Sequence, residues 1–271
     1  MRGIGRNDGV RAGVGYFLKW LPWRRSLAPK TTPRQPAAKR SGWLRAWRLL
    51  WRMVGLLAIS SVLLVEGLRS VPLPTSSVIS QYEIRSWWNS KAPAVRYVWT
   101  PYAEIAPEVA LAVLAAEDQR FPEHRGFDFV EIQNVLNDQQ DGKRPRGAST
   151  ISQQVAKNLF LWSGRSLIRK GLEVWFTLLL ELLWSKQRIL EVYLNIAEFG
   201  EGTFGVEAAS RRFFNKPAAR LTDDQAARLA AILPNPIRYR ADKPSAYILK
   251  RQQWIERQMV QLGGIAYLDK L

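Results

Sequence analysis

Apolar residues recur at helical spacing over most of the chain beyond residue 106. The clearest run, Val109 to Ala116, is apolar throughout and follows Pro107, a residue suited to the first turn of a helix. Strand-like alternation of apolar and polar positions is scarce, and internal repeats are absent. The pattern predicts a mainly α-helical domain, with helices over residues 106–117, 128–137, 150–160, 166–184, 186–195, 204–213, 222–233 and 245–262.

Residues 49–68 show a different pattern, in which apolar side chains fill the whole helical circumference. The centre, residues 53–65, carries no charge, and about 20 residues suffice for one transmembrane helix. Trp43, Trp47 and Trp51 recur every four positions, which places three indole rings on one helical face at the expected membrane boundary. A cleaved signal peptide and a buried soluble helix are alternatives. A transmembrane signal anchor fits better, because the basic segment before it is far longer than that of a signal peptide.

Positive charge is concentrated ahead of this anchor. The chain has a net charge of +17, but residues 1–52 hold 13 Lys and Arg and one acid, Asp8. Basic residues flanking a transmembrane helix stay on the cytoplasmic side. We therefore predict a basic cytoplasmic tail over 1–48, the anchor over 49–68 and an extracytoplasmic domain over 69–271. The remaining charge of that domain is too small to indicate a nucleic-acid partner.

The segment after the anchor is less informative. Val71–Thr75 contains two prolines and predicts an extended linker. Trp87, Trp88 and Trp99 lie in a region whose pattern predicts no element. Their rings are either ordinary core aromatics or contacts with the lipid surface beside the anchor.

Composition narrows the possible chemistry. Cysteine is absent, and His124 is the only histidine. These counts exclude disulfides, thiol nucleophiles, zinc sites built from Cys and His, and multi-histidine metal centres. Catalysis must therefore use carboxylates, hydroxyls, amides and basic side chains.

Glu117 closes the apolar helix and is the first candidate for such chemistry. A carboxylate at a helix C-terminus faces the negative end of the helix dipole, and Asp118 adds a like charge, so both oppose ionisation of Glu117. Arg120 acts in the opposite direction. Such an acid can be tuned toward proton transfer near neutral pH. For a Glu-Asp pair by itself, however, the better interpretation is that the two acids end a helix in solvent.

A second candidate segment begins at Thr150. Thr150 followed by Gln153 forms a capping box, which starts a helix. Gln153 and Lys157 then share one face of that helix. The helix N-terminus, with Lys157 on the same helix and Arg165 beyond it, has the features of a phosphate site.

A third candidate segment is a largely apolar helix that carries acids. Arg169, Glu173, Thr177 and Glu181 recur at intervals of four on one stripe. Acids on such a helix must be paired or face a polar cleft. Glu173 therefore has two interpretations, as half of a structural ion pair with Arg169 or as a group in a cleft.

These three segments resemble the signatures of the peptidoglycan glycosyltransferases of family 51. Residues 117–128 fill every position of Glu-Asp-x-x-Phe-x-x-His-x-Gly-x-Asp, and residues 147–154 match Gly-x-Ser-Thr-x-x-Gln-Gln. Residues 169–181 match Arg-Lys-x-x-Glu-x-x-x-Ala-x-x-Leu-Glu, except that a threonine replaces the alanine. Residues 186–195 and 204–216 are similar to two further segments of the family.

The resemblance implies a mainly α, lysozyme-like helical glycosyltransferase domain in the periplasm, which polymerises lipid II. The 4-hydroxyl of the acceptor sugar would attack the anomeric carbon of the growing strand, with release of undecaprenyl pyrophosphate. The catalytic residues implied are Glu117, as the base, and Glu173, which either orients the donor or holds Mg²⁺ or Mn²⁺; no cofactor is obligatory. Substrate-binding positions implied by the family patterns are Asp118, Arg120, His124, Ser149, Thr150, Gln153, Gln154, Lys157 and Arg165.

The resemblance also implies a single-pass protein of the bacterial inner membrane. Its expected partners are lipid II, the nascent glycan strand, the membrane, and other cell-wall synthases or division proteins. A lysozyme-like lytic glycosidase is an alternative, but a hydrolase that uses water needs neither the anchor nor a cationic phosphate site. A noncatalytic membrane scaffold is another, which the intact acids Glu117 and Glu173 disfavour. The chain has no Ser-x-x-Lys and no Lys-Thr-Gly sequence, so a monofunctional enzyme without transpeptidase activity is predicted.

Overall fold

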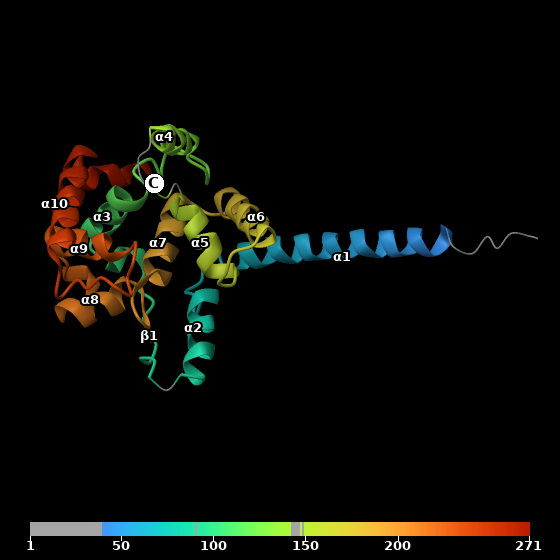
Figure 1. Ribbon diagram of the computed structural model, residues 1–271, viewed down its shortest axis with the longest axis horizontal. Helices are drawn as coiled ribbons and strands as arrows, with labels where there is room; N and C mark the ends of the chain where they lie inside the picture. The colour runs from blue at the N-terminus through green and yellow to red at the C-terminus, as the bar shows by residue number, and fades with distance from the viewer. Residues whose placement is uncertain (1–39, 90, 142–146, 148) are drawn as a thin grey trace, which may run out of the picture. The chain divides into compact units, whose positions relative to one another are not determined.

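The structure, a computed structural model, divides into two compact units, residues 1–51 and 52–271. It describes residues 40–89, 91–141, 147 and 149–271. The described chain is mainly helical (Figure 1). Its α-helices are α1 (Arg40–Gly67), α2 (Ser77–Trp87), α3 (Pro107–Glu117), α4 (Phe129–Gln140), α5 (Ile151–Phe160), α6 (Leu167–Leu183), α7 (Lys186–Ile196), α8 (Val206–Phe214), α9 (Asp223–Ile232) and α10 (Ala246–Gln261).

Shorter elements complete the second unit. The 3₁₀ helices are η1 (Tyr102–Glu104), η2 (Ala218–Arg220) and η3 (Gly264–Lys270), and the strands are β1 (Arg96–Tyr97), β2 (Glu198–Gly200) and β3 (Thr203–Phe204). The strands form one sheet in the order β1-β3-β2, in which β3 pairs parallel with β1 and antiparallel with β2.

Each helix predicted beyond residue 106 is present, with ends that differ by a few residues. Helix α2 and the small sheet were not predicted. The side chain of Ser76 caps α2 by accepting from the Ile79 amide, but Ile79 is the one buried residue of this helix, so no apolar stripe marks it. The strands are two or three residues long, too short for alternation to be detected.

Helix α3 is the centre of the core of the second unit. Every residue from Val109 to Ala115 is buried, because this helix is apolar on all sides. It packs against α9 and α10, while α5 packs against α6 and α7 (Figure 1). Full burial of one Val or Leu side chain contributes about 1.5–3 kcal/mol. The core therefore fixes the position of the helix end at Glu117.

One helix in the described part of the chain is long and apolar enough to cross a membrane, over Gly42–Gly67. Many large apolar side chains along it are exposed, which indicates single-pass membrane anchoring. The helix begins at Arg40, well before the predicted span of 49–68. Residues 1–39, most of the predicted basic tail, lie outside the described residues.

The three tryptophans ahead of the apolar centre lie along one face of α1. The ring centroids of Trp43 and Trp47 are 6.2 Å apart, and those of Trp47 and Trp51 are 5.7 Å apart. This spacing agrees with the shared helical face that the sequence predicted. Their place at a membrane boundary stays a prediction.

The end of α1 is bonded directly to the domain. Val65 is fully buried, and its carbonyl accepts a hydrogen bond from Trp184 Nε1 at 2.8 Å. The guanidinium of Arg188 donates to the carbonyl of Leu68 at 2.9 Å and to that of Val71. Three backbone carbonyls at and just after the helix end are therefore held by two side chains, that of Trp184 just after α6 and that of Arg188 on α7.

The Val71–Thr75 segment, predicted as an extended linker, is packed against the domain. Leu73 is 1% exposed, and its carbonyl accepts a hydrogen bond from the hydroxyl of Tyr97 at 2.5 Å. Proline keeps this backbone extended, and an extended backbone leaves carbonyls open, which Tyr97 and Arg188 use. The segment is an ordered part of the domain.

Trp87, Trp88 and Trp99, which the sequence left as either core aromatics or contacts with the lipid surface, do not share one environment. Trp99 packs against the core, and its ring lies 5.1 Å from the guanidinium carbon of Arg188. Trp87 and Trp88 are exposed by 78% and 88% at the C-terminal end of α2. Trp99 is thus a core aromatic, and the other two are surface residues.

The anchor junction predicts how truncation affects stability. A chain that lacks residues 1–68 is expected to be about 3 kcal/mol or more less stable than one that lacks residues 1–52. The larger deletion removes the buried Val65 side chain, worth about 1.5–3 kcal/mol, and bonds worth about 1 kcal/mol each. Urea unfolding of both chains in the same detergent measures the difference. Equal free energies of unfolding would contradict the stabilising contacts of residues 65–68 with Trp184 and Arg188.

Candidate active site

Glu117 lies at the last position of α3 with its side chain only 16% exposed. One carboxylate oxygen, Oε2, accepts a hydrogen bond from Gln154 Nε2 of α5 at 3.0 Å. The other, Oε1, is 4.0 Å from Arg251 Nη2 of α10. The hydroxyl of Tyr193, on α7, in turn donates to Gln154 Oε1 at 3.3 Å. Three helices besides its own therefore hold this carboxylate.

The pKa of Glu117 is raised, and burial is the main cause. The hydrogen bond from Gln154 and the positive charges of Arg251 and Lys157 lower it, while Asp118 raises it further. The upward direction predicted from the sequence is thus present, but its largest cause, desolvation, could not be identified before the fold was known. A carboxylate whose pKa is raised is a stronger base than an ordinary one, which suits it to accept a proton.

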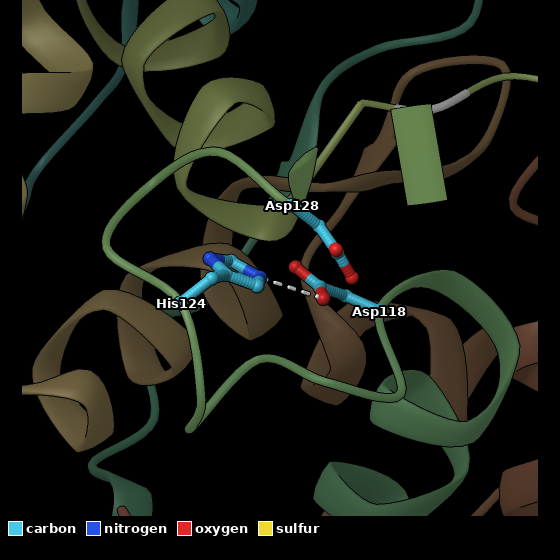
Figure 2. Close-up of side chains that lie close together, drawn as sticks. All are labelled: Asp118, His124 and Asp128. Carbon is cyan, nitrogen blue, oxygen red and sulfur yellow. Dashed lines mark hydrogen bonds and ion pairs between the residues drawn. The ribbon is translucent and has the colours of Figure 1, made fainter. Parts of the chain in front are cut away.

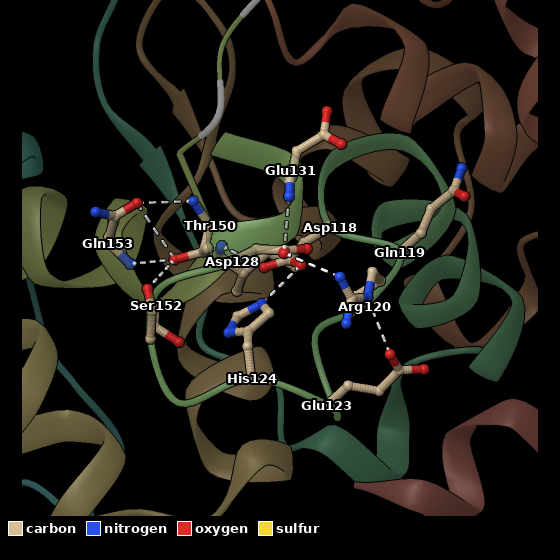
Figure 3. A network of polar contacts seen from close by, with 12 residues as sticks. Asp118, Gln119, Arg120, Glu123, His124, Asp128, Glu131, Thr150, Ser152 and Gln153 are labelled. Atoms are coloured by element: carbon tan, nitrogen blue, oxygen red, sulfur yellow. Dashed lines mark hydrogen bonds and ion pairs between the residues drawn. The ribbon is translucent and has the colours of Figure 1, made fainter. Parts of the chain in front are cut away.

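Both carboxylate oxygens of Asp118, the neighbouring acid, are hydrogen-bonded within the protein (Figures 2 and 3). It is 7% exposed. Its Oδ1 accepts from His124 Nε2 at 2.9 Å, and its Oδ2 accepts from the backbone N–H of Ile151 at 2.9 Å. Ile151 is the first residue of α5, so Asp118 places a negative charge on a helix N-terminus. This arrangement joins the end of α3 to the start of α5.

The loop from Asp118 to Asp128 is closed by a second set of polar contacts (Figure 3). Asp128 caps α4 by accepting from the Glu131 amide at 2.9 Å, and it also accepts from Arg120 Nη1 at 3.2 Å. Arg120 Nε donates to Glu123 at 3.0 Å. Arg120 therefore neutralises acids of its own loop and does not reach Glu117.

The ligand atoms of Asp118, His124 and Asp128 lie within 4.8 Å of one another, a spacing that could suit a metal ion (Figure 2). The donor set does not fit that role. Both oxygens of Asp118 and Nε2 of His124 are already hydrogen-bonded, and Asp128 is paired with the guanidinium of Arg120. A cation here would have to displace these partners and sit beside a positive charge.

The start of α5 confirms the predicted capping box. Thr150 Oγ1 accepts from the Gln153 amide, and Gln153 Oε1 accepts from the Thr150 amide at 3.0 Å. Thr150 Oγ1 also donates to the carbonyl of Gly126 at 2.7 Å. Both residues are buried, at 3% and 8% exposure, and the Thr150 hydroxyl and the Gln153 side-chain oxygen are bonded within the fold. Gln154 is the residue of this motif that reaches Glu117, and Ser149 is exposed.

Gly126 allows the loop to pack closely on α6. Its φ is +85°, and a Cβ atom at this position would lie 2.7 Å from the Cγ2 of Thr177. Only glycine accepts both the backbone angle and the approach. Thr177, the residue that departs from the family pattern, therefore forms part of the surface against which this loop packs.

A cavity of about 210 Å³ lies at the other end of α5. Three basic side chains contribute to its wall: Lys157, Arg165 and Arg169. Burial lowers the pKa of Lys157, while the charges of Glu173 and, more weakly, Glu117 raise it. The site thus gathers positive charge one helical turn beyond Gln154.

Glu173 is 4% exposed and forms ion pairs with two basic side chains. Its Oε2 accepts from Arg169 Nη1 at 3.0 Å, and its Oε1 accepts from Lys170 Nζ at 2.5 Å. Both carboxylate oxygens are therefore engaged by positive groups, and this acid does not fit the role of a metal ligand. It fixes the side chain of Arg169 beside the cavity.

Tyr193 of α7, which the sequence had placed among residues that brace the cleft, supports Gln154. Sequence reasoning missed two other residues of this site: Arg251 approaches Glu117 from α10, and Gln81 of α2 lines the basic cavity. Each comes from a helix distant in the sequence. The apolar periodicity that located α7 and α10 does not reveal where a polar side chain on them points, and α2 was not predicted.

Comparisons with known proteins identify the family of the chain. The chain matches the transglycosylase family model over residues 87–260. It is 53% identical over 231 residues to the biosynthetic peptidoglycan transglycosylase of Chromohalobacter salexigens, which covers 84% of this chain and 98% of the relative. It is 54% identical to the protein of the same name from Pectobacterium carotovorum (84% and 95%) and 52% identical to that from Pseudomonas entomophila (82% and 92%).

The contacts of Asp118 predict a stability effect. Asp118→Asn is expected to lower the free energy of unfolding by about 2–3 kcal/mol, because an amide cannot accept from both His124 and Ile151 through two oxygens. The matched control is Asp223→Asn, an exposed acid in the first turn of α9, with an expected loss below about 1 kcal/mol. Urea unfolding compares the two. Equal small losses would contradict a structural role for Asp118.

Proposed function

The chain belongs to the transglycosylase family and is a peptidoglycan glycosyltransferase, and we propose that it polymerises lipid II with Glu117 as the base. The observation that carries this assignment is the spacing along α5. Gln154 bonds the Glu117 carboxylate, and Lys157, one turn further on the same helix, lines the basic cavity. A base for a hydroxyl and cations for a phosphate leaving group are thereby one helical turn apart.

In the proposed reaction, Glu117 removes the proton from the 4-hydroxyl of the acceptor sugar. The hydroxyl oxygen forms a bond to the anomeric carbon of the donor strand while the bond from that carbon to the pyrophosphate breaks. Lys157 and Arg165 neutralise the charge that develops on the departing undecaprenyl pyrophosphate, as cations do in phosphoryl transfer. Lipid II and the growing strand are the substrates in this proposal.

Glu173 has an orienting role in this scheme. Because Arg169 and Lys170 occupy both of its oxygens, it holds Arg169 at the cavity wall and does not carry Mg²⁺ or Mn²⁺. The substrate-binding roles of Ser149, Arg120 and His124 stay predictions of the family resemblance. No step of the proposed reaction requires a bound metal or cofactor.

The arrangement of acids favours transfer over hydrolysis. A glycosidase generally needs two available carboxyl groups at the scissile bond. Asp118 and Glu173 have both oxygens bonded within the protein, whereas Oε1 of Glu117 has no hydrogen bond from the described residues. One base with a separate cationic pocket supports attack by a sugar hydroxyl on a pyrophosphate-linked donor.

We place the domain in the periplasm, with the N-terminus in the cytoplasm of a cell whose inner membrane holds α1. The 13 Lys and Arg of residues 1–52 support this orientation. The bonds from Trp184 and Arg188 to the end of α1 keep the domain close to that membrane, where the lipid tails of both substrates stay embedded. Contacts with other cell-wall synthases or division proteins are predictions of the resemblance alone.

The base assignment is tested by Glu117→Gln. Polymerisation is expected to fall at least about 100-fold, because general base catalysis contributes about 10²–10⁴ in rate. The measurement is the size and amount of glycan formed from lipid II by the purified full-length protein. The control, Glu104→Gln, changes an exposed acid and should keep normal activity. Near-normal strand synthesis by a folded Glu117→Gln protein would refute the assignment.

The phosphate role is tested by Lys157→Ala. Loss of one charge-assisted contact of about 1.5–3 kcal/mol predicts a rise in KM for the lipid-linked substrate of about 10–100-fold. Initial rates at increasing lipid II concentration give this value. Lys250→Ala, an exposed lysine on α10, is the control. Unchanged KM in the Lys157 variant would place the pyrophosphate elsewhere.

A further inference from the structure

Arg251 is a charged residue at Glu117 that the mechanism above does not use. It lies on α10, which packs against α3, and its side chain is 24% exposed. Its Nη2 is 4.0 Å from Glu117 Oε1. Its Nε is buried and has no hydrogen-bond partner among the described residues. A buried guanidinium N–H without a partner has a cost, so the position of this side chain requires an explanation.

We propose that Arg251 is a positioning residue that keeps the Glu117 carboxylate ionised and turned toward the acceptor hydroxyl. This inference rests on the proposed role of Glu117 as the base. Gln154 fixes one carboxylate oxygen from α5, and Arg251 faces the other from α10. The base is thus held between a neutral donor on one side and a cation on the other.

The distance of 4.0 Å is central to this inference. A guanidinium bonded at about 2.8 Å would occupy Oε1 and compete with the substrate hydroxyl for it. At 4.0 Å the attraction between the charges persists, while the lone pairs of Oε1 remain available to receive a proton. Arg251 therefore favours the ionised form without blocking the atom that acts as the base.

The hydrogen bond from Gln154 favours the ionised form of Glu117 most, and Arg251 is the strongest of the charged groups that favour it. Asp118, the next residue, opposes ionisation, although its own oxygens are bonded to His124 and to the N-terminus of α5. Lys157 of α5 favours ionisation more weakly than Arg251 does. Tyr193 of α7 faces the site as a neutral hydroxyl bonded to Gln154. Burial opposes the charge, so the nearest cation has the largest electrostatic effect in the favourable direction.

The test compares pH profiles of kcat/KM for Arg251→Gln, Arg251→Lys and the control Arg257→Gln in full-length protein with lipid II as substrate. Arg257 lies on the same helix and is exposed. The acid limb of such a profile reports the pKa of the base in the free enzyme. Removing a cation raises that pKa, so the acid limb of Arg251→Gln should move to higher pH by about one unit. At a pH below the acid limbs of both the variant and the unchanged protein, kcat/KM of the variant should then be lower by about tenfold.

Arg251→Lys keeps the charge and should restore most of the lost activity at low pH, and Arg257→Gln should leave the limb in place. Thermal melting of each variant identifies any loss of folding, and the Lys variant keeps the test decisive if the Gln variant is unstable. A pH-independent rise in KM would make Arg251 a substrate ligand and overturn the proposal, as would an unchanged profile.

Failure of this proposal is distinct from failure of the proposed function. If Glu117→Gln retains activity, the base assignment itself is wrong, whatever Arg251 does. If Glu117→Gln is inactive while the acid limb of Arg251→Gln stays at its original pH, only the role of Arg251 is refuted.

Discussion

Two adjacent acids at the end of a largely buried helix are the constraint on which this structure depends. Helix α3 is buried from Val109 to Ala115, so the acids at its C-terminal end are largely removed from solvent. Buried carboxylates must be hydrogen-bonded or paired with charges. Asp118 meets this need with the N-terminus of α5 and His124, and Glu117 meets it with Gln154 and the nearby Arg251. The partners of these two acids bring α5 and α10 to the end of α3.

Helix α5 converts that constraint into an active site. Its first amide binds Asp118, its fourth residue, Gln154, binds Glu117, and Lys157 lines the cationic cavity one turn later. Because each residue of the helix adds about 1.5 Å along its axis, α5 sets the distance between the base and the phosphate site. The capping box at Thr150 fixes the first residue of α5. Gly126 lets the preceding loop pack against α6 without a clash.

Helix α7 connects the same site to the membrane anchor. Arg188 near its start holds the carbonyls that follow α1, and Tyr193 further along it supports Gln154. Arg188 is itself fixed by an ion pair with Glu191 at 2.6 Å and by the rings of Trp99 and Trp184. One rigid helix therefore lies between the end of the anchor and the residues that orient the base.

The sequence by itself determined the elements with long periodic patterns and the residues whose chemistry depends on their immediate neighbours. The helices beyond residue 106, the apolar span before residue 68, the capping box at Thr150 and the acid at the end of α3 all follow from local spacing. Tertiary structure decided which polar groups meet. Burial as the main cause of the raised pKa of Glu117, the engagement of Asp118 and Glu173 by protein partners, and the approach of Arg251 from α10 depend on packing between segments far apart in the chain. Periodicity reports which face of a helix is apolar, but the direction and partner of a polar side chain are set by the neighbouring helices.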